Sequence, residues 1–333
     1  MLFRAFRTVS TPAIKLCSLA FRPVFGNFGA SYKAMNPEKI RLNMAVMSDI
    51  HLDSRKDRIR RLHDGLYDLE NAKTPNDVLA CVGDTTDHGY EEHWKKVEEV
   101  FAAHKPAKNI FLVLGNHDSW TDEKEPKPFD VLFKEYSEKV SGRKLDKLYF
   151  SQKINGYTLI SLASEEDSLD ASISQEQINW FADEMELAAK DGKPIFVFMH
   201  QSINVTHGLP FTWCRKWKED SVVKPMEGGI GVSSDEIEAI LRKYKNVFYF
   251  SGHIHMGLSG KRHHAKWGYS SAESDGSFHK INLPCFMFAN HHGLPATGLG
   301  FQFEVYDDEV IMRPRSYASR IWYSSYNKTF KLI

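Results

Sequence analysis

Short apolar segments alternate with amphipathic patterns along most of the chain. Five mainly apolar segments have the length of buried strands; they are residues 43–47, 78–82, 109–114, 195–199 and 247–250. Between them, apolar residues recur every three or four positions, which predicts amphipathic helices at residues 58–70, 94–101, 174–189 and 234–243. This alternation predicts a layered α/β fold.

Local signals add two hairpins and one helix start. The Asn155-Gly156 pair is a strong turn signal and predicts a hairpin within residues 149–162. A second hairpin is expected within residues 301–313. Ser174 followed by Gln177 is a capping-box pattern, which predicts where a helix begins. Hairpins late in the chain, after the helix–strand alternation, predict mixed sheets covered by helices.

Polar residues that can bind metals follow every one of the five predicted strands. Ligand sites in layered α/β folds lie beyond the carboxyl ends of the strands, so we expect these side chains at one common edge. Carboxylate, carboxamide and imidazole groups suit Zn, Fe or Mn, and the absence of cysteine there argues against a structural zinc site. The residues are Asp49, His51, Asp84, Asp87, Asn116, His117, His200, His253 and His255.

The spacing within these motifs also favours a shared site. Residues two apart in an extended chain point to the same side, so Asp49 with His51, and His253 with His255, can bind one ion. Each piece has a simpler structural interpretation, since Asp84 could cap a helix and a lone histidine is more often a core residue. Five such pieces in order, each after a strand, favour a metal site over these alternatives.

The ordered motifs resemble those of the calcineurin-like metallophosphoesterase superfamily. They read D-x-H, G-D-x-x-D, G-N-H-D, a solitary His and G-H-x-H, and they span residues 45–256. The resemblance implies a four-layer α-β-β-α sandwich with mixed sheets, the metallo-dependent phosphatase-like fold. We expect a phosphoesterase domain at residues 41–315, a basic extension at 1–40 and an aromatic tail at 316–333 that packs on the domain.

The resemblance also implies two metal ions, Mn, Fe or Zn, and assigns a role to each motif residue. One ion is bound by Asp49, His51, Asp84 and His255, and the other by Asp84, Asn116, His200 and His253. Asp84 bridges the two ions. In the family His117 is not a ligand but faces the substrate, and the Asp87 carboxylate is expected to pair with it.

The expected chemistry is hydrolysis of a phosphoester. Two cations lower the pKa of a bridging water, and the resulting metal-bound hydroxide attacks phosphorus. His117 as imidazolium protonates the leaving oxygen, and Asp87 favours the charged form of that imidazole. Neutral Asn116 supplies an oxygen without adding negative charge to a site that must accept a phosphate anion.

Departures from the family patterns point to one branch of the superfamily. Protein Ser/Thr phosphatases carry an Arg where His88 follows Asp87, and purple acid phosphatases carry a Tyr at position 87. The motifs here look more like the small phosphodiesterase branch, which includes class III cyclic-nucleotide phosphodiesterases. A phosphodiester is therefore the expected substrate. The alternatives are a phosphomonoesterase or nuclease with the same centre, or a non-catalytic metal-bound scaffold.

Substrate contacts are expected from the segments between the metal motifs. Residues 201–232 interleave aromatic and basic side chains, which can stack a base and bind a remote phosphate, or simply anchor the loop to the domain. We expect Asn116, His117 and His207 to contact substrate. Residues 261–264 are either part of the same site or a solvated run of charge, and residues 290–292 are expected to form a turn.

Composition changes this picture only slightly. The chain of 333 residues carries 43 basic and 43 acidic residues, so a small phosphorylated substrate such as a nucleotide is expected rather than a stable nucleic-acid complex. Residues 1–37 contain five basic residues and no acidic one, which suggests a targeting or membrane-surface segment or an extension that packs on the domain. The scattered cysteines read as reduced thiols, which favours a cytoplasmic location. No apolar stretch is long enough to predict a membrane span.

Overall fold

The computed structural model describes residues 27–28, 31–122, 125–213, 228–258, 269–290, 293–294 and 296–333. Most of the basic extension therefore lies outside the described residues. So do residues 214–227 of the segment 201–232, the run at 261–264 and two residues of the expected turn, 291–292.

The first sheet joins the beginning of the domain to the end of the chain. Its strand order is β1-β13-β12-β11-β2-β3-β4, with β14 also paired to β12. Strands β2, β3 and β4 are parallel, whereas β11 runs antiparallel to β2, so the sheet is mixed. The strands are β1 (Asn27–Phe28), β2 (Leu42–Met47), β3 (Val78–Val82), β4 (Asn109–Val113), β11 (Leu299–Val305), β12 (Glu309–Ser316), β13 (Ile321–Trp322) and β14 (Lys328–Lys331).

The second sheet is formed by the middle of the chain, in the order β5-β6-β7-β8-β10-β9. Strands β6, β7, β8 and β10 are parallel, and the edge strands β5 and β9 are antiparallel to their neighbours. The strands are β5 (Phe150–Ile154), β6 (Tyr157–Ser161), β7 (Ile195–Phe198), β8 (Val247–Ser251), β9 (Ala272–Asp275) and β10 (Phe278–Asn282).

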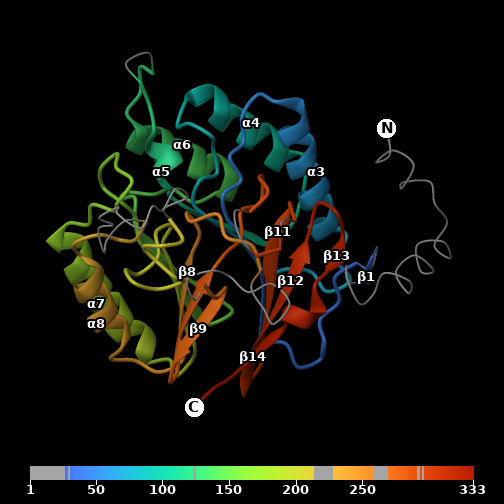
Figure 1. Cartoon of the computed structure of the whole chain (residues 1–333), viewed down its shortest axis with the longest axis vertical. Coiled ribbons are helices and arrows are strands. Elements are labelled where there is room, and N and C mark those ends of the chain that lie inside the picture. The colour runs from blue at the N-terminus through green and yellow to red at the C-terminus, as the bar shows by residue number, and fades with distance from the viewer. Residues whose placement is uncertain are drawn as a thin grey trace.

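Helices cover the outer face of each sheet, as Figure 1 shows. The first sheet is covered by α3 (Lys56–Glu70), α4 (Glu91–Ala102), the short α5 (Asn116–Ser119) and α6 (Phe129–Ser141). The second is covered by α7 (Gln175–Ala189) and α8 (Ser234–Leu241), and a 3₁₀ turn lies at Ser324–Tyr326. The predicted four-layer α-β-β-α sandwich is confirmed.

Alternating side chains along β7 and β8 build two separate cores. Phe198 and Phe250 point between the sheets, where they contact Phe111 of β4 and Phe303 of β11 at centroid distances of 5.2 and 4.9 Å. Val197, on the opposite face of β7, belongs to the core under α7 and α8. These strands are uniformly apolar because both of their faces are buried.

Several elements differ from their expectation. The sequence pattern did not predict α6, β9, β10, β13 or β14. Ser174 caps α7 by accepting a hydrogen bond from the Gln177 N–H, but the reciprocal half of the capping box is absent. The Gln177 side chain is instead fully buried. It accepts a hydrogen bond from the Ala163 N–H and donates one to the Ala163 carbonyl, just after the end of β6.

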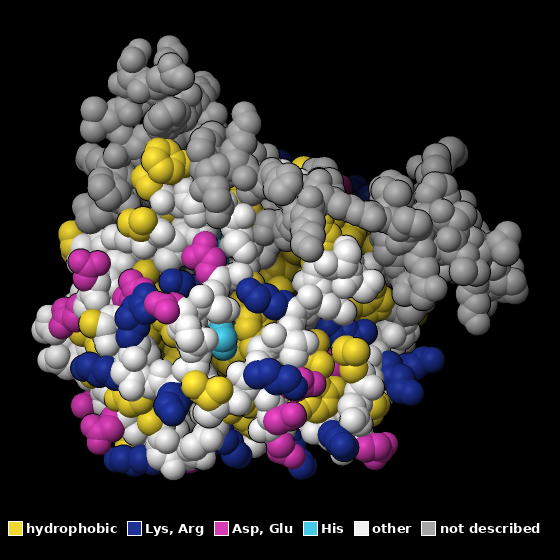
Figure 2. All heavy atoms as spheres, turned by 60° about the horizontal axis from the view of Figure 1, so that its bottom comes forward, with side chains coloured by type: hydrophobic (Ala, Val, Ile, Leu, Met, Phe, Trp, Pro, Cys, Tyr) yellow, Lys and Arg dark blue, Asp and Glu magenta, His cyan; other side chains and the backbone are white. Residues whose placement is uncertain are grey.

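Basic and acidic side chains are interspersed on the face that Figure 2 shows. Cys81 and Cys285 are buried free thiols. Within the described ranges no helix combines the length and the hydropathy of a membrane-crossing segment.

Candidate metal centre

The predicted ligands meet at one edge of the sandwich, where both sheets present the carboxyl ends of their parallel strands. Strands β2, β3 and β4 of the first sheet end just before the three N-terminal motifs, and β7 and β8 of the second sheet end just before the two others. Two groups of side chains there have the spacing of a metal site and share Asp84. They are Asp49, His51, Asp84 and His255, and Asp84, His200 and His253.

The first group places two imidazoles against carboxylates. The Nε2 atoms of His51 and His255 lie 3.1 Å apart, and His255 Nε2 is 3.0 Å from Asp49 Oδ1. His51 Nε2 is also 3.6 Å from Asp84 Oδ2. Ring nitrogens and carboxylate oxygens therefore converge on one point, as ligands of a single cation do.

The second group carries buried polar atoms without a hydrogen-bond partner. They are Nε2 of His253 and Oδ1 of Asn116. His200 Nδ1 contacts the Val82 carbonyl at 2.9 Å, which directs its Nε2 toward Asp84 Oδ2 at 3.1 Å. A buried polar atom without a partner is costly, so two of them beside the His200–Asp84 pair indicate a place where a cation can bind.

The backbone at these residues is unusual. Five predicted ligands adopt left-handed conformations, with φ between 43° and 69°. The interpretation of D-x-H and H-x-H as extended chain is therefore wrong, although the side chains still converge. Strained backbone of this kind persists where the surrounding structure imposes it, and it concentrates at functional sites. The residues are Asp49, His51, Asp84, His253 and His255.

Two motif glycines allow the loops to approach one another. A Cβ on Gly115 would lie 2.1 Å from the Asp84 backbone nitrogen and 2.3 Å from its Oδ1. A Cβ on Gly252 would lie 2.6 Å from Asp49 Oδ2. The glycines of G-N-H-D and G-H-x-H are thus required by close packing against the carboxylates of Asp84 and Asp49.

The buried charges stabilise one another. Burial raises the pKa of Asp84, but the charge and contact of His200 outweigh it and hold the pKa well below its ordinary value. In the same way, burial opposes but His255 lowers the pKa of Asp49 to about 2. Asp84 raises the pKa of His200 to about 9 against the effect of burial. Burial and then the charge of His200 lower the pKa of His253 to about 3.

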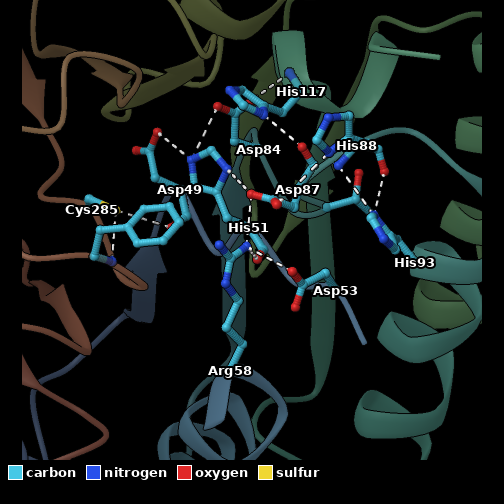
Figure 3. Close-up of polar contacts among 12 residues, drawn as sticks. Asp49, His51, Asp53, Arg58, Asp84, Asp87, His88, His93, His117 and Cys285 are labelled. Carbon is cyan, nitrogen blue, oxygen red and sulfur yellow. Dashed lines mark hydrogen bonds and ion pairs between the residues drawn. The ribbon is translucent and has the colours of Figure 1, made fainter. Parts of the chain in front are cut away.

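His117 lies at the rim of the cluster, next to Asp87. Its Nδ1 contacts the main-chain oxygen of Asp87 at 2.7 Å, rather than the Asp87 carboxylate. That carboxylate lies 3.4 Å from Nδ1 of His51 and 2.8 Å from the guanidinium of Arg58 (Figure 3). The carboxylate thus contacts Arg58 and His51 directly, while it still lies within 4.8 Å of a His117 ring nitrogen, so the expected pairing of Asp87 with His117 stays a prediction.

Arg58 is a site residue that the sequence pattern did not single out. Its guanidinium donates to the His51 carbonyl at 2.7 Å and lies 4.6 Å from the centre of the Phe288 ring. Arg58 was assigned to an amphipathic helix, where a cation normally faces solvent. The sequence signal that could have identified it is its position. Arg58 comes seven residues after the D-x-H histidine and lies four residues before Leu62, on the apolar face of α3.

Asp118 is a second residue whose role was missed. Its carboxylate accepts hydrogen bonds from the backbone N–H groups of Thr85, Thr86 and Gly115. Burial and then the charge of Asp84 raise the pKa of Asp118 to about 6. Asp118 thus ties the loop after β3 to the loop after β4, and it holds Asp84 and Asn116 in register.

His207, the predicted substrate contact, makes its hydrogen bonds to residues outside the ligand groups. Its ring is buried, its Nδ1 contacts the Ser270 carbonyl at 2.6 Å, and its backbone N–H donates to Glu273. Trp213, from the same insert, stacks on His253 at a centroid distance of 4.4 Å. Trp213 therefore covers the ring of a predicted ligand.

Comparison with known proteins agrees with this geometry. The family model described as calcineurin-like phosphoesterase matches residues 42–257, which contain all five motifs. The chain therefore belongs to the calcineurin-like phosphoesterase family. No curated protein sequence matches the chain.

Solved structures share the fold at low sequence identity. A dimetal phosphatase from Danio rerio aligns with a TM-score of 0.59 at 11% identity, covering 88% of this chain and 100% of that chain. The Plasmodium protein GAP50, described as the anchor in the inner membrane complex, aligns with a TM-score of 0.52 at 13% identity, covering 87% and 88% of the two chains. These likenesses concern the fold alone.

Proposed function

We propose that this protein is a dinuclear-metal phosphoesterase that hydrolyses a phosphodiester. The observation that carries the proposal is the pair of ligand groups that share the single carboxylate of Asp84. Asp49, His51, Asp84 and His255 would bind one cation, and Asp84, Asn116, His200 and His253 the other. The two unpartnered buried atoms of the second group, His253 Nε2 and Asn116 Oδ1, fit this assignment, because a cation would satisfy both of them.

Each side chain has a role that follows from its position. Two divalent cations, Mn, Fe or Zn, would lower the pKa of a coordinated water and neutralise charge on the phosphate. Asp84 holds the two ion sites together. Asp49 Oδ1 and Oδ2 also accept the His253 N–H, which fixes the loop after β8 against the first sheet.

His117 acts as the general acid in this proposal. A carbonyl only accepts hydrogen bonds, so the contact with the Asp87 main-chain oxygen requires a proton on His117 Nδ1. Nε2 is then the atom that can face the substrate. When the phosphorus–oxygen bond to the leaving group breaks, Nε2–H donates its proton to the departing oxygen and His117 becomes neutral.

The charge balance around Asp87 supports a diester over a monoester. Arg55 and Arg58 both contact Asp87, and both also pair with Asp53. Two guanidinium groups are thus balanced by two carboxylates. Beyond the charge of the two cations, these guanidinium groups thus add no net positive charge for a phosphomonoester dianion, which favours the diester monoanion.

The decisive experiment measures turnover of bis-(p-nitrophenyl) phosphate and of p-nitrophenyl phosphate after reconstitution with Mn²⁺. We expect two bound ions per chain and a higher kcat/KM for the diester. A higher kcat/KM for the monoester would overturn the diester proposal. If two ions bind and neither compound is hydrolysed, the protein is a metal-bound scaffold.

A further inference from the structure

Three partly exposed aromatic rings lie beside His117. Trp120 follows α5 directly, and its ring meets the His117 ring edge-on at a centroid distance of 4.6 Å. The His88 ring lies nearly parallel to Trp120, with 19° between the planes at 6.1 Å, and to Tyr90, with 18° at 5.3 Å. We call Tyr90, His88 and Trp120 the aromatic ledge.

The ledge is accessible to a ligand. Trp120 is 43% exposed and the His88 side chain 44% exposed. Figure 3 shows His88 beside His117, on the side of the cluster away from Cys285, and the two ring centroids are 6.3 Å apart. A large aromatic ring that is kept exposed next to a reactive group is more typical of a binding surface than of a fold.

The ledge is also held rigidly by its two loops. The Gly89 N–H donates to the Trp120 carbonyl at 3.0 Å, and a Cβ on Gly89 would lie 2.2 Å from the Asp118 carbonyl oxygen. The Tyr90 hydroxyl donates to Asp122 at 3.0 Å. A ligand that stacks on these rings therefore loses little free energy in ordering them.

The position of the ledge defines which part of the substrate it meets. His117 delivers its proton to the leaving oxygen, so the rings that surround His117 lie on the leaving-group side of the phosphorus. Tyr90 and Trp120 offer neutral π faces, which suit a planar ring and have no charge to bind a second phosphate.

We propose that the aromatic ledge binds a nucleobase on the leaving group of the substrate, so that the protein hydrolyses nucleoside phosphodiesters. This inference rests on the proposed phosphodiesterase function and specifies its substrate class. It assigns Trp120 as the main stacking residue, because its ring is both exposed and in contact with His117.

The test compares two substrates that differ only in the base. One is a cyclic adenosine phosphodiester, and the other is the same cyclic diester with hydrogen in place of the base. In a cyclic diester both ester oxygens belong to the sugar, so the leaving group always carries the base when there is one. We expect the Mn²⁺-loaded wild type to favour the base-containing compound in kcat/KM by about fivefold to a hundredfold.

Trp120→Ala should abolish most of this preference, and Trp120→Phe should retain part of it. The ratio isolates stacking, because loss of the contact with His117 slows both substrates alike. Tyr67→Ala is the matched control, since Tyr67 is similarly exposed at 41% but lies on α3. A wild type that does not prefer the base-containing diester would contradict base binding by the aromatic ledge. A preference that survives in Trp120→Ala would contradict it as well.

A binding measurement separates the ledge from the proposed function. If neither cyclic diester is hydrolysed, calorimetry with adenosine monophosphate and ribose phosphate on the Mn²⁺-loaded protein replaces the kinetic ratio. Tighter binding of the nucleotide that is lost in Trp120→Ala supports the ledge even though hydrolysis has failed. Equal binding of the two compounds, or an affinity ratio unchanged in Trp120→Ala, refutes it.

Discussion

His117 is the residue whose chemistry the structure constrains most closely. Its Nδ1 is held by a main-chain oxygen, so removing the side chain leaves the ligand groups intact. We expect His117→Ala to bind two ions as the wild type does but to lose about 10²–10⁴-fold in kcat. The measurement is turnover with metal analysis of the same sample.

Leaving-group chemistry distinguishes an acid from other roles of His117. A good leaving group such as p-nitrophenolate departs without a proton, whereas an alkyl alcohol does not. The loss in His117→Ala should therefore be larger for the alkyl ester. Equal losses for both esters would contradict the role of general acid.

His279, which lies outside the metal-ligand groups, should make the stability of the fold depend on pH. Its ring lies against Phe248 and Phe330, and its Nε2 has no hydrogen-bond partner. Burial, together with the positive charge of Lys328, lowers its pKa to about 4. The pKa of His279 is lower in the folded protein than in the unfolded chain. Its contribution to stability is therefore fully present above about pH 6.5 and is lost as the pH falls toward 4.

The His279→Gln variant tests this linkage, because glutamine keeps a polar side chain but does not take up the proton. Urea unfolding at pH 7 and pH 5 should show that the variant loses less stability on acidification, with a difference of up to about 2 kcal/mol. The same loss in both proteins would show that His279 does not contribute.

At the residue scale, the sequence was informative about chemistry but not about orientation. The side chains that gather at the metal centre could be named because each follows an apolar strand. The direction of the Asp87 carboxylate could not, because it depends on Arg58, which reaches the site from a helix. The exposure of Trp120 could not be predicted either, since it results from how two loops pack.

At the scale of elements, one buried ion pair joins α3 to β12. Arg315 donates twice to the Asp68 carboxylate, at 2.6 and 2.7 Å, and both side chains are almost fully buried. We expect Arg315→Met to reduce the free energy of unfolding by about 3–5 kcal/mol, because the buried Asp68 charge then keeps only the longer contact with the partly exposed Arg320, at 3.9 Å.

The double variant Arg315→Met with Asp68→Asn provides the control. It removes both charges, so it should recover part of the loss in urea unfolding. A double variant less stable than Arg315→Met would contradict the ion-pair explanation. A cost below about 1 kcal/mol for Arg315→Met would contradict it as well.

Uniformly apolar runs and clear helical spacing predicted most elements, and elements with weaker patterns were missed. The five strands that precede the motifs are mostly buried on both faces, so their apolar runs are unambiguous. Helix α6 was missed because its apolar pattern is weak. Of its 13 residues, the buried apolar ones are Leu132, Phe133 and Tyr136. Strands β9 and β14 were missed because they are short edge strands with exposed polar residues.

At the scale of the whole molecule, the metal centre connects the two sheets. Asp49, His51 and Asp84 come from the first sheet, whereas His200, His253 and His255 come from the second. Ions that bind only this assembled arrangement must stabilise the native state.

We therefore expect chelation by EDTA to lower Tm by several degrees, and Mn²⁺ at a hundred times its Kd to contribute about 2.7 kcal/mol. Differential scanning calorimetry of the full chain measures the shift. Asp84→Asn is the control variant and should lose most of it, because the bridging carboxylate is gone. A Tm that is independent of both Mn²⁺ and EDTA would contradict the proposed centre.

The sharing of each ligand group between two sheets has a consequence for how the protein is made. During synthesis the ribosome releases Asp49, His51 and Asp84 long before His200, and His253 and His255 follow last. Until His253 and His255 have emerged, neither set of four predicted ligands is complete, because the first set lacks His255 and the second lacks His253. Metal loading is therefore a late event, and it reports that the second half of the domain has folded onto the first.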